Sequence, residues 1–153
     1  MSEVRVSFER ILVATDFSEC AQCAIDLALD MAHKFDARLV LVHCWEAPSY
    51  AYGGGLYASV DAITPIERAA NRCLEQALDE LKLSAPDATS LLRSGVAWEE
   101  ILLAAAESRA DLIVLGTHGR RGLSRALLGS VAERVVRMAR LPVLTVHAPT
   151  PRK

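Results

Sequence analysis

Five short apolar runs recur along the chain, and a helical pattern of apolar residues separates each run from the next. The runs occupy 10–16, 38–44, 88–93, 112–115 and 142–147, and these lengths suit buried strands. The segments 19–35, 64–83, 98–108 and 129–140 carry apolar residues at helical spacing. This alternation predicts an α/β fold, an open and doubly wound (Rossmann-like) sheet of five parallel strands with helices on both faces.

The size of the chain suits one domain. Its 153 residues contain no internal linker, so we expect a single domain over 1–153 with a core of about 8–148. Hydrophobic residues make up 52% of the chain and aromatic residues only 5%. Aliphatic side chains must therefore fill most of the core.

The charge and hydropathy of the chain give no reason to expect nucleic acids or membranes as partners. The formal net charge is −2, which does not favour nucleic-acid binding. No apolar run approaches the roughly 18 residues of a membrane span, and the charged N-terminus does not resemble a secretory signal. Four cysteines without such a signal are typical of reduced thiols, so we expect a cytoplasmic protein.

The segment after the fourth apolar run is rich in glycine. Gly116 ends the run, Gly119 and Gly122 follow at intervals of three, and Gly129-Ser130 opens the next helical pattern. Glycines let backbone N–H groups approach phosphate oxygens, and a helix start adds unpaired donors. The segment predicts an anion site, although it is neither a P-loop nor a dinucleotide fingerprint. We expect a side chain at Gly119 or Gly129 to occupy space that phosphates need, and to block them without unfolding the domain.

The first apolar run ends in the polar sequence Thr15-Asp16-Phe17-Ser18. Asp16 or Ser18 can cap the helix that follows. Ligands of open α/β sheets bind outside the carboxyl ends of the strands. If the first and fourth strands are neighbours, Asp16 and the turn after Gly116 bound a single crevice.

These features resemble the universal stress protein family over almost the whole chain. The sequence ILVATDFS at 11–18 is similar to the family's first strand and turn. The G-x2-G-x9-G-S motif that begins at Gly116 matches the glycine signature of the ATP-binding branch. The segments 131–136 and 142–146 resemble the family's ending.

The resemblance implies a sheet in the order 3-2-1-4-5, with ATP between the first and fourth strands and a homodimer paired through the last strand, Val143–Val146. Asp16 would lie near the ribose or a magnesium ion, and the backbone of Cys44 would contact adenine. The residues implied to contact the nucleotide are Ala14, Thr15, Asp16, Cys44, Leu115, Gly116, Thr117, Gly119, Gly129, Ser130 and Val131. Ala132 stands where some ATP-binding members have a hydroxyl residue, which removes one phosphate contact.

Helix capping is a simpler explanation for some of these residues. Asp16-x-x-Glu19 and Ser130-x-x-Glu133 both have the spacing of a capping box, and capping and nucleotide contact can coexist. The sequence TPIE at 64–67 likewise predicts the start of the second helix, with a Thr cap and Pro in the first turn.

The charged and imidazole side chains near the glycines have two interpretations each. Arg120, Arg121 and Arg125 could neutralise phosphate charge or lie on a solvated loop. His118 lies in the glycine turn and could reach a phosphate. His43 falls in an apolar strand, where a packed core residue is the simpler interpretation.

Two further features carry weaker signals. Cys20-x-x-Cys23 has metal or redox spacing, but a second ligand pair is absent and the two residues fall in a helical pattern. The stretch 45–62 is irregular and holds three consecutive glycines, so it is either a functional loop or a surface connection.

The first functional hypothesis is an ATP-binding, dimeric stress-response regulator with unknown regulatory partners. No general base is evident, so any ATP hydrolysis should be slow. A second hypothesis is a nucleotidyl or phosphoryl transferase on the same scaffold. A third is a dimerisation module whose site is empty or holds AMP or another adenine nucleotide.

Overall fold

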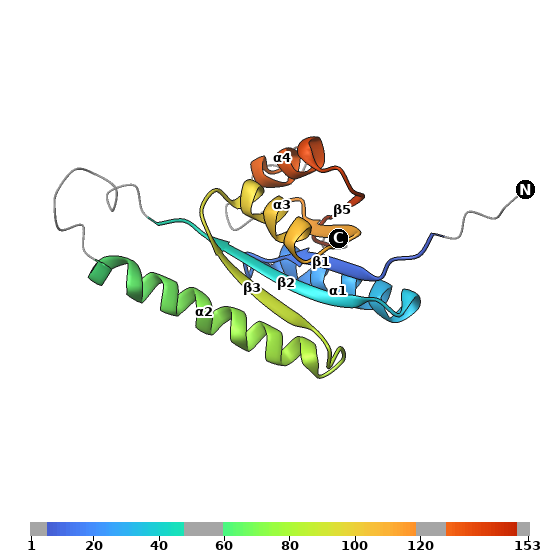
Figure 1. Cartoon of the computed structure of the whole chain (residues 1–153), viewed down its shortest axis with the longest axis horizontal. Helices are drawn as coiled ribbons and strands as arrows, with labels where there is room; N and C mark the ends of the chain where they lie inside the picture. The colour runs from blue at the N-terminus through green and yellow to red at the C-terminus, as the bar shows by residue number, and fades with distance from the viewer. Residues whose placement is uncertain (1–5, 48–59, 119–127, 150–153) are drawn as a thin grey trace, which may run out of the picture.

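Strands and helices alternate along the chain, as the apolar periodicity predicts. The computed structural model describes residues 6–47, 60–118 and 128–149. The elements are β1 (Arg10–Ala14), α1 (Glu19–Phe35), β2 (Arg38–Trp45), α2 (Val60–Lys82), β3 (Thr89–Ser94), α3 (Ala97–Glu107), β4 (Leu112–Gly116), α4 (Ser130–Met138) and β5 (Val143–Val146) (Figure 1).

The sheet is parallel and has the strand order β3-β2-β1-β4-β5. This confirms the order 3-2-1-4-5 that the family resemblance implies. β1 is the central strand, and its Ile11 is aligned with Leu39 of β2 on one side and Leu112 of β4 on the other. The chain moves outward from β1 in both directions, so the ends of β1 and β4 meet at the point where ligands bind in such sheets.

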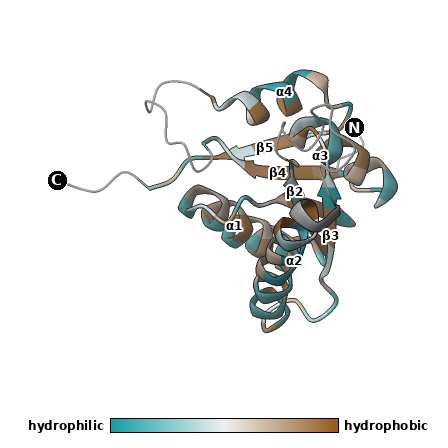
Figure 2. Cartoon of the chain, turned by 90° about the vertical axis from the view of Figure 1, so that its left-hand side faces the viewer, coloured by the Kyte–Doolittle hydropathy of each residue, from teal (hydrophilic) through white to brown (hydrophobic). Residues whose placement is uncertain are grey.

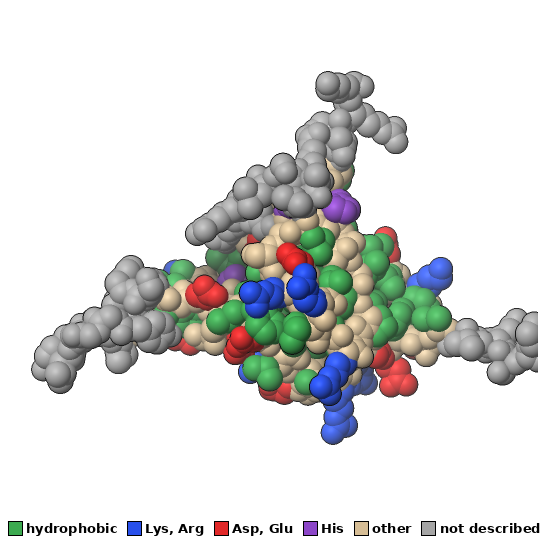
Figure 3. All heavy atoms as spheres, turned by 90° about the horizontal axis from the view of Figure 1, so that it is seen from above, with side chains coloured by type: hydrophobic (Ala, Val, Ile, Leu, Met, Phe, Trp, Pro, Cys, Tyr) green, Lys and Arg blue, Asp and Glu red, His purple; other side chains and the backbone are tan. Residues whose placement is uncertain are grey.

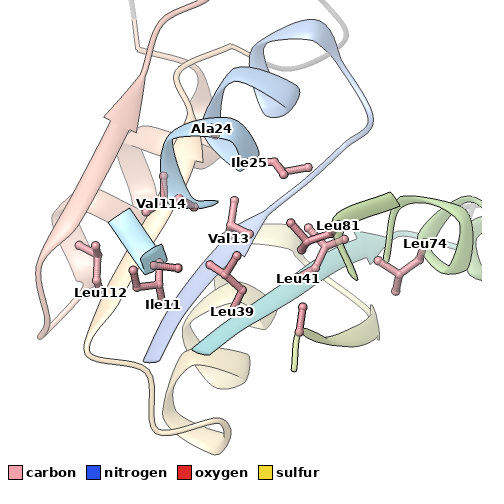
Figure 4. Close-up of a cluster of buried hydrophobic side chains, with 13 residues drawn as sticks. Ile11, Val13, Ala24, Ile25, Leu39, Leu41, Leu74, Leu81, Leu112 and Val114 are labelled. Carbon is pink, nitrogen blue, oxygen red and sulfur yellow. The ribbon is translucent and has the colours of Figure 1, made fainter. Parts of the chain in front are cut away.

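Helices cover both faces of the sheet, because alternate strand residues point to opposite sides. One core lies between the sheet and the helices α1 and α2 (Figure 4), and the second lies against α3 and α4. Figure 2 shows the apolar sides of the helices turned towards the strands. The first core includes Ile11, Val13, Ala24, Ile25, Leu39, Leu41, Leu74, Leu81, Leu112 and Val114, and the second includes Leu12, Val40, Val42, Ile101, Ala104, Ile113, Leu115, Ala132 and Val135.

The outer surface on the side of α4 mixes charged and apolar side chains (Figure 3). On α4, Arg137 and Glu133 form an ion pair of 2.7 Å at i, i+4 spacing, while Val136 and Met138 are exposed. The longest helix, α2, is rich in charged residues. Among the helices that the structure describes, none combines the length and apolar character that a bilayer crossing requires.

The start of the second helix differs from its prediction. α2 begins at Val60, so Thr64 is not its cap and Pro65 lies inside the helix. Proline lacks an N–H and leaves one carbonyl of the first turn without its helical donor. Packing of the buried Leu74 and Leu81 against the sheet stabilises the helix beyond this point. The other predicted boundaries shift by one or two residues, and most of the 45–62 stretch lies outside the described residues.

Candidate functional site

A cavity of about 610 Å³ opens at the carboxyl ends of the strands, between the ends of β1 and β4. Its lining includes ten of the eleven residues that the family resemblance implies, and the eleventh, Gly119, lies outside the described residues. The described lining residues are Ala14, Thr15, Asp16, Ala21, Val42, Cys44, Glu46, Ala97, Ile101, Leu115, Gly116, Thr117, His118, Gly129, Ser130, Val131 and Ala132. Sequence positions far apart therefore converge on one cavity, while their contact with a nucleotide stays a prediction.

Side-chain oxygens shape the turn that brings Asp16 to the cavity. The backbone N–H of Phe17 donates to Oγ1 of Thr15 at 3.0 Å, and the N–H of Ser18 donates to Oδ1 of Asp16 at 3.0 Å. The hydroxyl of Ser18 accepts from the N–H of Ala21 at 3.2 Å and is the N-cap of α1. Asp16 therefore stabilises the turn, and Ser18 caps the helix.

His43 supports the same turn from β2. Its Nδ1–H donates to the carbonyl oxygen of Thr15 at 2.8 Å, and its ring lies 4.4 Å from the ring of Phe17. Phe17 has a φ of 63°, a left-handed conformation that non-glycine residues rarely adopt. His43 is thus a half-buried residue with a polar partner, and not the packed core residue that its apolar strand suggests.

The two glycines at the other side of the cavity make room for protein atoms. A Cβ on Gly116 would lie 2.8 Å from Sγ of Cys20, at the start of α1. A Cβ on Gly129 would lie 2.7 Å from the carbonyl oxygen of Thr117, and Gly129 has a φ of −60°. A side chain at Gly129 would therefore meet the backbone just after β4, while its effect on phosphate binding stays a prediction.

The N-terminus of α4 faces the cavity without a side-chain cap. Its N-cap is Gly129, and no side-chain hydrogen bond to the first turn is present among the described residues. The predicted capping box is wrong, since Ser130 is the first helical residue and Glu133 pairs with Arg137. Residues 129–132 all line the cavity. The N–H of Gly129 donates to Thr117, while the N–H groups of 130–132 have no partner within the helix, so these donors and the positive end of the helix dipole lie beside the cavity.

The opposite wall is mainly apolar. Val42 and Cys44 extend from β2, and Ile101 comes from α3. Burial raises the pKa of the Cys44 thiol from its usual 9.0 to about 12, with the Glu100 carboxylate adding to the rise and Arg93 opposing it. Cys44 therefore stays a neutral thiol at physiological pH.

Sequence reasoning missed five lining residues, which are Ala21, Val42, Glu46, Ala97 and Ile101. The alternation of strand residues could have found Glu46, because it shares a face with Cys44 two positions earlier. Ala97 and Ile101 share a helix face at i, i+4 spacing. Their position over the cavity depends on how α3 packs, which the sequence pattern does not specify.

A polar cluster closes the cavity beside β4. Oγ1 of Thr117 lies 3.0 Å from Nδ1 of His118 and 2.9 Å from Nδ1 of His147. Thr117 is fully buried. Nε2 of His118 is also buried, and it has no hydrogen-bond partner among the residues that the structure describes.

The cysteine motif of α1 serves packing. Cys20 is buried, and its thiol donates to the carbonyl oxygen of Val146 at 3.1 Å. Cys23 is half-buried, and all four cysteines are free. Within the described ranges, no three His, Cys, Asp or Glu side chains are grouped so that they could hold a metal ion.

Both the sequence and the fold of this chain resemble those of known proteins. Residues 7–147 match the universal stress protein family. A universal stress protein of Methanocaldococcus jannaschii is 34% identical over 147 residues, which cover 93% of this chain and 84% of that protein. The fold is similar to a universal stress protein of Lactobacillus plantarum, with a TM-score of 0.80, 24% identity, and coverage of 93% of this chain and 99% of that one. A universal stress protein solved in complex with cAMP has a TM-score of 0.64 and 27% identity, over 94% of this chain and 100% of that chain.

Proposed function

Since the chain belongs to the universal stress protein family, we propose that it binds an adenine nucleotide, with ATP as the main ligand, in the cavity between β1 and β4. A structural relative at 27% identity was solved with cAMP, which supports an adenine ligand. The cavity volume of about 610 Å³ lies within the range of about 300–1,000 Å³ that is usual for small-molecule sites. One observation carries the proposal. An apolar wall, a carboxylate and an uncapped helix start all converge on this one cavity.

The apolar wall suits the base. Val42, Cys44 and Ile101 offer apolar surface of the kind that lines pockets for flat rings. The neutral thiol of Cys44 places no charge against the base. Glu46 lines the same cavity, and its carboxylate would accept a hydrogen bond from an exocyclic amino group or a sugar hydroxyl.

Asp16 suits the ribose. In nucleotide-binding α/β sheets an acidic side chain accepts hydrogen bonds from ribose hydroxyls. The turn holds Asp16 through the N–H of Ser18, so the carboxylate is oriented before any ligand arrives. Asp16 would also be the ligand of a magnesium ion that enters with ATP, because carboxylate oxygens are preferred by that cation.

The start of α4 suits the phosphates. Ser130 and Val131 line the cavity with backbone donors that lack helical partners, which is the usual arrangement of an anion site. The N–H of Gly129 already donates to Thr117, so Gly129 would contribute the close approach of its backbone. The hydroxyl of Ser130 is not used for capping and adds a further donor. Gly119 and the arginines at 120, 121 and 125 lie outside the described residues, and their phosphate contacts remain part of the proposal.

The protein would act as a cytoplasmic, homodimeric regulator of a stress response and hydrolyse ATP slowly at most. β5 lies at the edge of the sheet, and an apolar edge strand favours pairing with a second copy. A multiple-turnover phosphate-release assay on the purified protein would measure the hydrolysis directly. Turnover comparable to that of ordinary enzymes would favour the transferase alternative.

Titration calorimetry of ATP, AMP and adenosine tests the binding proposal. We expect ATP to bind the wild-type protein and Asp16→Ala to weaken ATP binding by tenfold or more, since about 1.5–3 kcal/mol is typical of a hydrogen bond to a charged group. Ser18→Ala is the matched control, because it alters the same turn without removing a proposed ligand contact. Absence of binding by any adenine nucleotide would refute the proposal.

A further inference from the structure

The hydroxyl of Thr117 joins the rings of His118 and His147 from a fixed position. Its Oγ1 lies within 3.0 Å of Nδ1 on both rings. The backbone of Thr117 is held on both sides, since its N–H donates to Val146 at 2.8 Å and its carbonyl accepts from Gly129 at 2.7 Å. The thiol of Cys20 donates to the carbonyl oxygen of Val146, and its sulfur lies 4.0 Å from Oγ1 as a weak and distant acceptor. The two rings are therefore the closer hydrogen-bond partners of this hydroxyl.

A hydroxyl has one hydrogen and two lone pairs. When both rings are neutral, it can donate to one ring and accept from the other. In the first such arrangement, His147 donates its Nδ1–H to Thr117, Thr117 donates to Nδ1 of His118, and His118 carries its hydrogen on Nε2. In the second, the direction is reversed and Nε2 of His118 is a bare acceptor. In a third arrangement, both rings donate to Oγ1 and the hydroxyl hydrogen turns to the sulfur of Cys20, 4.0 Å away. The first two arrangements avoid this long contact, and in them Thr117 couples the tautomers of the two rings.

One added proton favours a hydrogen on Nε2 of His118. If the proton is on His118, both of its ring nitrogens carry hydrogen and Thr117 donates to His147. If the proton is on His147, that ring donates to Thr117, Thr117 donates to Nδ1 of His118, and the neutral His118 has its hydrogen on Nε2. As long as Thr117 donates to a ring and not to the more distant sulfur of Cys20, Nε2 of His118 is an N–H donor in both charged arrangements.

The two rings lie in different surroundings. His118 lines the cavity, and its Nε2 is a buried atom without a partner in the described part of the chain. His147 follows β5 and is exposed to solvent. The chain of hydrogen bonds therefore leads from the cavity beside the start of α4 to the surface.

The described carboxylates around the cavity come from two elements. Asp16, after β1, and Glu46, after β2, line the same cavity. Cys44 is a neutral thiol there, and Cys20 on α1 faces Thr117 through its thiol. The arginines of 119–127 lie outside the described residues. A phosphate in the cavity adds negative charge, which would stabilise a proton on the pair when the ligand is bound.

We propose that Thr117, His118 and His147 form a proton-coupled phosphate contact, in which His118 donates its Nε2–H to a phosphate oxygen of the nucleotide and binding draws one proton from solvent onto the histidine pair. The inference rests on the proposed nucleotide function and adds a linkage to pH. Because imidazole is the group that ordinarily changes charge between about pH 5 and 8, affinity for phosphate rises as pH falls through this range.

Calorimetry of AMP binding in two buffers of different ionisation enthalpy measures the protons taken up. The phosphate of AMP itself titrates near pH 6, so the protein's share is the difference between wild type and variant. His118→Asn keeps a side-chain partner for Thr117 but does not reach the position of Nε2. We expect this variant to weaken AMP binding about tenfold, which is the loss typical of one charge-assisted hydrogen bond. Its affinity for adenosine should stay within about twofold of the wild type. The protein's share of the proton uptake should be abolished.

Three further variants separate coupling from simple contact. His118→Gln retains an N–H near Nε2 and should keep most of the affinity while losing the uptake. His147→Asn retains a donor to Thr117 and should lower the uptake, although the side chain is outside the cavity lining. The control is His33→Gln, because His33 is bonded to the carbonyl of Ser84 far from the cavity, and its proton uptake should equal that of the wild type.

The outcomes distinguish the two proposals. Binding of AMP with the same proton uptake in wild type and His118→Asn would overturn the inference and leave the proposed function intact. Unchanged uptake in His147→Asn would overturn the coupling through Thr117. If the wild type binds neither AMP nor adenosine, the proposed function fails and this inference fails with it.

Discussion

The amide nitrogen of Gly129 donates to the carbonyl oxygen of Thr117 at 2.7 Å, and a Cβ on Gly129 would lie 2.7 Å from that same oxygen. This contact joins the start of α4 to the end of β4. It also holds the backbone of Thr117, whose hydroxyl lies between two histidine rings. The glycine therefore fixes the geometry of the proposed phosphate end through protein atoms.

Gly129→Ala should destabilise the domain. The added methyl overlaps a backbone oxygen, and overpacking of this kind typically costs about 1–3 kcal/mol. Chemical denaturation with far-UV circular dichroism measures the change in unfolding free energy. The adjacent Ser130→Ala is the control, because Ser130 is exposed and makes no cap bond, and it should stay within about 0.5 kcal/mol of the wild type. Equal stability of Gly129→Ala and wild type would contradict the contact.

Asp16 and Ser18 should separate ligand binding from helix stability. Ser18→Ala removes the N-cap of α1 and should cost about 1 kcal/mol of stability. Asp16→Asn keeps an oxygen that accepts from the N–H of Ser18, so its stability should be close to that of the wild type while its ATP affinity falls. Thermal unfolding and calorimetry on the same samples measure both effects. Loss of stability in Asp16→Asn with unchanged ATP affinity would show that Asp16 stabilises the fold and does not contact the ligand.

The sequence predicts local features well where one interaction decides them. The apolar runs place all five strands within a few residues, because burial on both faces of a parallel sheet requires them. The strand order follows from the resemblance to a family and not from periodicity. The cap assignments at Asp16 and Ser130 are less secure, since several nearby side chains can satisfy the same N–H groups. The structure selects Ser18 and Gly129.

Long-range contacts explain what the sequence pattern does not predict. His147 ends the last predicted run and carries no local signal of a polar partner, yet the β4–β5 pairing brings its Nδ1 to 2.9 Å from Oγ1 of Thr117. Likewise, the sequence pattern assigns Gly116 and Gly129 to phosphate binding. The atoms nearest to a Cβ added at these two positions belong to Cys20 and Thr117. These roles depend on the packing of α1 against β4 and on the path into α4.

Cys44 should make stability depend on pH in the alkaline range. Its folded-state pKa of about 12 exceeds the usual 9.0, so the thiol's contribution is fully present below about pH 9 and is lost as pH rises towards 12. The slope is at most about 1.4 kcal/mol per pH unit. Denaturant unfolding of wild type and Cys44→Ala from neutral to alkaline pH measures the difference, which should shrink as pH rises. A constant difference would contradict the raised pKa.

The same burial should make Cys44 slow to alkylate. The thiolate is the reactive form, and at neutral pH Cys44 is protonated. The exposed Cys73 should react first with iodoacetamide, as peptide mass spectrometry can show. Cys44 should react slowly with and without ATP, because burial already limits access to its thiol in the free protein. Rapid labelling of Cys44 in the free protein would show that its thiol is accessible.

The open edge of β5 should carry the dimer contact. The carbonyls of Pro142 and Val146 accept from β4, so by the alternation of a parallel ladder the backbone N–H of Thr145 points to the open edge. Thr145→Pro removes that edge donor and leaves the bonds to β4 in place. We expect the proline variant to sediment as a monomer, and Thr145→Val, which keeps the N–H, to sediment as the wild type does. Val143→Lys is a poorer test, because Val143 also packs against the core beside α4. A wild type that is monomeric at tens of micromolar, the range of about 10⁻⁵ M where weak dimers still form, would refute pairing through this edge.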